Sequence, residues 1–146
     1  MGIAALIAWI ITAGGGFVLL ATWFTRGGAR PGSSSRFSPA MIFGHFGIAA
    51  VGLVVWIIYV AASSKALAWI AFVLLVPVAL LGFTMFFRWL PGFRARSAAP
   101  AGGPGTASTT DLQPAEQHFP VVVVGAHGLL AVTTVVLVLL AAIGVG

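Results

Sequence analysis

The sequence predicts an all-α integral membrane protein, a four-helix bundle whose helices cross the bilayer one after another. Four apolar stretches, each about as long as a bilayer is thick, fill most of the 146 residues. Hydrophobic residues make up 60% of the chain and charged residues only 6%, whereas a soluble domain carries about 25% charged residues. We therefore expect the lipid bilayer to be the main partner of this chain.

The four predicted helices cover residues 3–24, 39–61, 66–90 and 119–143. At a rise of 1.5 Å per residue, about 22 residues span roughly 33 Å, the thickness of a hydrocarbon core. The first stretch lacks a basic leader and is longer than the apolar part of a signal peptide, so we expect it to be a retained helix. Pro77 lies inside the third stretch and is expected to kink it.

The basic residues predict the orientation in the cell membrane. The second connection holds only Lys65, and six basic residues flank the first and third connections: Arg26, Arg30, Arg36, Arg88, Arg94 and Arg96. The positive-inside rule places these two connections in the cytoplasm and both termini outside. It also accounts for the net charge of +5, so we expect no nucleic-acid partner. Trp23 and Trp89 are expected to be anchors at the membrane interface.

Residues 97–115 are rich in Pro, Gly, Ser, Thr and Ala. Such a composition buries too little apolar surface to offset the entropy lost on ordering, so we predict a flexible cytoplasmic linker. This linker lies within a single transmembrane domain, residues 1–146.

The second and fourth apolar stretches resemble each other. A shift of 81 positions aligns a proline and two glycines without a gap: Pro39 with Pro120, Gly44 with Gly125, and Gly47 with Gly128. This pattern predicts two tandem two-helix repeats with the second and fourth helices parallel, as in transporters built from parallel repeats.

Two histidines lie within these matching stretches, one residue out of register. His45 follows Pro39 by six residues and His127 follows Pro120 by seven, which places both roughly 9–10 Å into the membrane. Each begins a helical face rich in small residues, Ala49 and Gly52 after His45, and Ala131 and Thr134 after His127. Small residues are typical of helix contacts in membranes, so we expect both histidines to point inward.

Two histidines at one depth on neighbouring helices suit the axial ligands of a b-type haem. We therefore expect His45 and His127 to be the metal ligands of one haem b in an electron-transfer subunit, with glycines allowing the helices close to the macrocycle. Its propionates would meet basic residues at the near interface, namely Arg36, Arg88, Arg94 and His118.

Two alternatives stay open. Each histidine can instead donate a hydrogen bond to a neighbouring helix, in a cofactor-free accessory subunit of a larger, respiratory-type membrane complex. Copper binding is a further alternative, because Met41 lies one turn before His45 and a thioether and an imidazole can both bind copper. No residue pattern for catalysis is present, and we expect no catalytic activity of the chain's own.

The last helix, HFPVVVVGAHGLLAVTTVVLVLLAA (His118–Ala142), and the arginine-bearing linker before it resemble small four-helix membrane proteins predicted from actinobacterial genomes. That resemblance covers the second half of the chain and implies no particular activity. In architecture alone, the chain also resembles small b-type cytochromes with bis-histidine haem. It departs from them in having only two membrane histidines, which allows at most one such haem.

Overall fold

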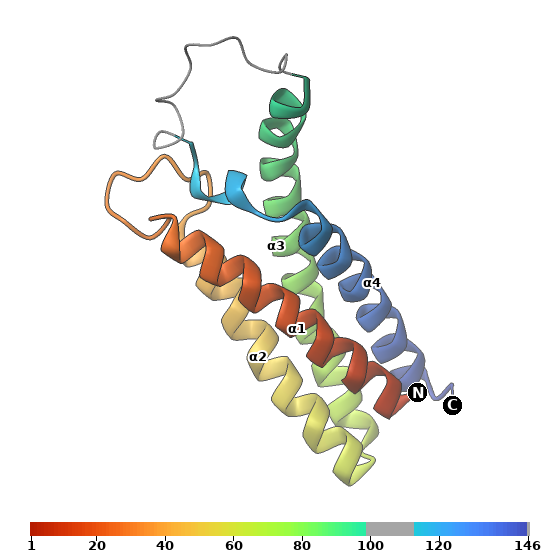
Figure 1. Ribbon diagram of the computed structural model, residues 1–146. Helices are drawn as coiled ribbons and strands as arrows, with labels where there is room; N and C mark the ends of the chain where they lie inside the picture. The colour runs from red at the N-terminus through yellow and green to blue at the C-terminus, as the bar shows by residue number, and fades with distance from the viewer. Residues whose placement is uncertain (99–112, 146) are drawn as a thin grey trace, which may run out of the picture.

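A computed structural model describes residues 1–98 and 113–145 of the chain as a bundle of four long helices (Figure 1). These are α1 (Gly2–Thr25), α2 (Pro39–Ala62), α3 (Lys65–Ala98) and α4 (Val121–Ile143), and a short 3-10 helix, η2 (Ala115–His118), precedes α4. All four long helices are long and apolar enough to cross a membrane. The all-α four-helix prediction is therefore confirmed.

The predicted boundaries agree within two residues for α1, α2 and α4, but α3 is longer than predicted. It continues through Pro91 to Ala98 instead of ending at Leu90, so Arg94 and Arg96 lie on the helix rather than in a connection. A helix does not need lipid around it, and Pro91 removes only one backbone donor. The predicted linker is correspondingly shorter, since Ala115 is buried at the start of η2, while residues 99–112 lie outside the described part.

The long helices pair as α1 with α4 and α2 with α3, which make the most extensive contacts in the bundle. The segment that precedes α2 also contacts η2, because Ser35 donates a hydrogen bond to Glu116. Both α2 and α4 therefore begin at the same end, here called the loop end, whereas both chain termini lie at the other end (Figure 1). Ser38 caps α2 by accepting a hydrogen bond from the Met41 backbone, and Ser63 ends α2 in the left-handed region, at φ 51°.

Two buried aromatic clusters fill the bundle core. The terminal cluster lies near the chain termini and comprises Ala5, Trp9, Trp56, Ala68, Ala71, Leu75, Val138, Ala141 and Ala142. The loop-end cluster comprises Trp23, Phe37, Ile42, Trp89 and Ala115. Large apolar side chains also cover the outside of the bundle, for example Ile3, Val122 and Leu129, which is the surface expected of helices solvated by lipid.

Trp23 and Trp89 were predicted to be anchors at the membrane interface, but both side chains are buried inside the protein. Trp23 is fully buried and Trp89 is 4% exposed, both within the loop-end cluster. The Trp23 indole donates a hydrogen bond to Ser35, so the segment that leads into α2 satisfies its polar group inside the protein. Trp69, in contrast, is 40% exposed near the start of α3, as an interfacial anchor would be.

Candidate functional site: a histidine pair in the bundle core

His45 on α2 and His127 on α4 face each other between the two aromatic clusters. Their ring centroids are 6.4 Å apart and the ring planes are inclined by 56°. The backbones of these two helices do not come into close contact in the described residues, and the two imidazole side chains meet between them. The sequence prediction that both histidines point inward is confirmed.

The residues that follow each histidine on its helical face are also buried. On α2 they include Gly52 and Trp56, and on α4 they include Thr134 and Val138. The spacing of these residues at i+7 and i+11 follows the repeat of an α-helix, so one stripe on each helix lines the core.

Each histidine donates a hydrogen bond to a backbone carbonyl of the helix with which its own helix pairs. His45 Nδ1 lies 3.0 Å from the Val78 oxygen on α3, and His127 Nδ1 lies 2.9 Å from the Thr12 oxygen on α1. A carbonyl oxygen can only accept, so Nδ1 carries the hydrogen in both rings. In a neutral imidazole this leaves Nε2 with a free lone pair, the form of histidine that binds metals.

A glycine makes room for each ring on the neighbouring helix. A Cβ atom on Gly82 would lie 3.4 Å from His45 Cε1, and a Cβ atom on Gly16 would lie 3.1 Å from His127 Cε1. Each glycine stands four residues after the carbonyl that the ring binds, so ring and carbonyl meet on one helical face. The sequence offered a weak signal for this, since a glycine inside an apolar helix often marks a close approach.

Four further glycines lie on the same helices as the histidines and were expected to let those helices approach a macrocycle. Gly44, Gly47, Gly125 and Gly128 flank the histidines, but a Cβ atom on any of them would meet nothing within 4 Å. They therefore open space beside the histidines rather than bringing two helices into contact.

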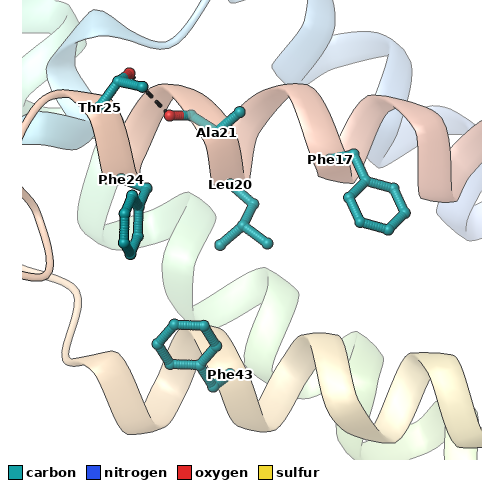
Figure 2. Close-up of a pocket in the computed structure, with 6 residues that line it drawn as sticks. All are labelled: Phe17, Leu20, Ala21, Phe24, Thr25 and Phe43. Atoms are coloured by element: carbon teal, nitrogen blue, oxygen red, sulfur yellow. Dashed lines mark hydrogen bonds between the residues drawn. The ribbon is translucent and has the colours of Figure 1, made fainter.

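A surface groove between α1 and α2 begins at the depth of the histidine pair. Figure 2 shows its lining residues, which are almost all apolar: Phe17, Leu20, Ala21, Phe24, Thr25 and Phe43. Phe17 directly follows Gly16, and Phe43 precedes His45 by two residues. The groove has a volume of about 350 Å³, within the range of about 300–1,000 Å³ typical of ligand sites.

The basic residues predicted to contact a cofactor lie towards the loop end, at different distances along the bundle. Arg88 follows Gly82 by six residues, or about 9 Å of helix, and Arg94 follows it by twelve, or about 18 Å. The Arg88 guanidinium donates to the Arg36 carbonyl. His118 is partly buried and its Nδ1 has no hydrogen-bond partner in the described structure. Of the two α3 arginines that were predicted to contact the cofactor, Arg88 thus lies nearer the depth of the histidines.

Sequence reasoning missed a buried carboxylate at the loop end. Glu116 on η2 is fully buried. Its two carboxylate oxygens accept hydrogen bonds of 2.7 Å, one from the Ser35 hydroxyl and one from the Arg36 backbone. Ser35 in turn accepts from the Trp23 indole and the Phe37 backbone. We call these five residues the Glu116 network, which ties the segment before α2 to the segment before α4.

In residues 1–98 and 113–145, no three His, Cys, Asp or Glu side chains gather as a metal site would require. The histidine pair thus brings two imidazole rings together, with no third such side chain beside them in the described residues. Comparisons with protein-family models, with curated proteins and with solved structures give no match.

Proposed function

We propose that the protein is a membrane electron-transfer subunit that binds one haem b between His45 and His127. The observation that carries the proposal is the facing pair of imidazoles, each held by a carbonyl through Nδ1 so that Nε2 is left for a metal. Metal-binding histidines commonly donate their other nitrogen to a carbonyl or carboxylate, which fixes the orientation of the ring.

The spacing of the pair would allow both imidazoles to hold one metal ion. An imidazole nitrogen binds a first-row metal at about 2 Å, so two such rings have centroids roughly 6 Å apart, close to the 6.4 Å between these rings. Haem supplies the remaining iron ligands itself, which agrees with a site of two protein ligands. When bound, it would accept and release one electron at a time.

The surroundings of the pair support an apolar, flat cofactor. The apolar groove lies between α1 and α2, which contact each other less than either contacts its paired helix. Arg88, Arg94 and His118 are proposed to serve the propionates, and Arg88 is the best placed of the arginines on α3. Arg36 was also expected there, but its side chain lines a separate pocket at the loop end. Their side chains would neutralise the acid groups at the membrane interface.

We also propose that the chain consists of two tandem two-helix repeats. The contacts of the two histidines support this. His127 on α4 binds the Thr12 carbonyl of α1 and packs against Gly16. In the same way, His45 on α2 binds the Val78 carbonyl of α3 and packs against Gly82. A two-fold axis along the membrane normal would relate the two halves. The arginines around the loop end support a cytoplasmic location for that end, with both termini outside the cell membrane.

The test is the visible spectrum of protein purified from haem-supplemented cells. We expect a Soret band, and visible bands that sharpen on reduction, in the wild-type protein. His45→Ala and His127→Ala should each abolish these bands, because each would remove one of the two side chains proposed to hold the haem iron. His118→Ala is the matched control, since it removes a histidine outside the pair and should leave the bands in place.

A colourless wild-type protein with its four helices intact would refute haem binding. The histidines would then act as hydrogen-bonding ties between helices, as expected of a cofactor-free accessory subunit. A copper content that depends on Met41 would favour the copper alternative. Met41 is only partly buried, one turn before His45.

A further inference from the structure

A second pocket lies at the loop end, beside the starts of α2 and α4 and the last turn of α3, and its lining includes two arginines and two glutamines. It has a volume of about 190 Å³ and is lined by Arg36, Gly92, Arg96, Gln113, Pro114 and Gln117. Arg36 precedes α2, Arg96 lies in the last turn of α3, and Gln117 precedes α4. The pocket is smaller than the roughly 300–1,000 Å³ of drug-sized sites, so it suits a small polar group.

Two guanidinium groups provide the positive charge of this pocket. In the described part of the chain, the hydrogen bonds of Arg36 use its backbone, which binds Glu116 and Arg88. Arg96 donates one N–H to the Gln117 carbonyl, which holds it at the pocket. A guanidinium has five N–H donors, so both side chains retain donors for an anion, and Arg is well suited to phosphate.

The same pocket contains an unsatisfied acceptor. Gln117 is 5% exposed, and its side-chain nitrogen donates to the Trp89 carbonyl at 3.4 Å. Its Oε1 atom is buried and has no partner in residues 1–98 and 113–145. Buried acceptors are normally satisfied, so a ligand at this pocket would be expected to bring a hydroxyl or amine donor beside its negative charge.

We propose that this pocket binds the headgroup of an anionic glycerophospholipid, with Arg36 and Arg96 on the phosphate and Gln117 on a headgroup hydroxyl. The position supports a lipid source, since the pocket lies where α2 and α4 enter the membrane and lipid phosphates lie at that depth. Basic pockets between membrane helices are recognised sites for acidic headgroups. This inference does not depend on the proposed haem.

The experiment measures binding of short-chain lipids to the detergent-purified full chain by native mass spectrometry. Dioctanoyl phosphatidylglycerol should bind at least tenfold more tightly than dioctanoyl phosphatidylcholine, whose headgroup carries a compensating positive charge. Phosphatidylmethanol has the same charge as phosphatidylglycerol but no hydroxyl. It should bind several-fold more weakly if Gln117 accepts from the headgroup.

Arg36→Gln and Arg94→Gln form a matched pair of variants. Both remove one positive charge from an exposed arginine at the loop end, but only Arg36 lines the pocket. Arg36→Gln keeps the backbone contacts of that residue and should weaken phosphatidylglycerol binding about tenfold, which is about 1.4 kcal/mol. Arg94→Gln should leave it within twofold.

Equal losses in the two variants would show unspecific attraction and overturn the proposal, as would equal binding of phosphatidylcholine. Competition by glycerol phosphate at the same concentration as phosphatidylglycerol would assign the pocket to a free anion and overturn the lipid source. Equal binding of phosphatidylmethanol would overturn the role of Gln117.

Discussion

Removing the buried carboxylate of Glu116 should destabilise the bundle more than any exposed charge change. In the wild-type protein, the Ser35 hydroxyl and the Arg36 backbone N–H each lie 2.7 Å from a carboxylate oxygen of Glu116. Glu116→Ala leaves both donors without this acceptor. Hydrogen bonds to charged groups contribute about 1.5–3 kcal/mol each, and burying the charge offsets part of this. We expect Glu116→Ala to lower the free energy of unfolding by about 3 kcal/mol.

Glu116→Gln should have a smaller effect, because it keeps the shape and one acceptor oxygen. The second oxygen becomes an NH₂ group that faces a donor. The Ser35 hydroxyl can rotate away from it, but the Arg36 backbone N–H cannot. We expect a loss of about 1–2 kcal/mol for this variant.

The assay is reversible unfolding of the purified protein in mixed micelles, titrated with a denaturing detergent and followed by circular dichroism. Arg94→Gln is the control, since that side chain is exposed and its replacement should change stability by less than about 0.5 kcal/mol. Ser35→Ala combined with Glu116→Ala should cost less than the sum of the single changes, because they share one hydrogen bond. A Glu116→Ala variant as stable as Arg94→Gln would refute this account of the network.

Two further predictions concern the histidine pair and the orientation. Gly16→Ala would place a Cβ atom 3.1 Å from His127 Cε1, so we expect overpacking to lower the free energy of unfolding by about 1–3 kcal/mol. Gly44→Ala is the control, since its Cβ atom meets open space and should leave stability unchanged in the same unfolding assay. Equal stabilities of the two variants would contradict the packing around His127. A reporter that fluoresces only in the cytoplasm should be dark when fused after Val145 and bright when inserted after Gly103; the reverse pattern would invert the proposed topology.

The sequence by itself determined the four helices and the direction in which their histidines point. Hydropathy over about 20 residues is a strong signal for a membrane helix. The residues that share a helical face with His45 and His127 follow from the local geometry of an α-helix alone. The end of α3 was missed because hydropathy ends with the membrane, whereas backbone hydrogen bonds continue through Arg94 to Ala98.

Only the tertiary structure decided which groups meet. The Thr12 carbonyl is far from His127 in the sequence, and the Ser35 hydroxyl is 81 residues from Glu116. Periodicity shows which face of a helix is buried but not which helix lies opposite. The burial of Trp23 and Glu116 has the same origin, because a charged or interfacial residue becomes a core residue only when another segment covers it and satisfies its polar atoms.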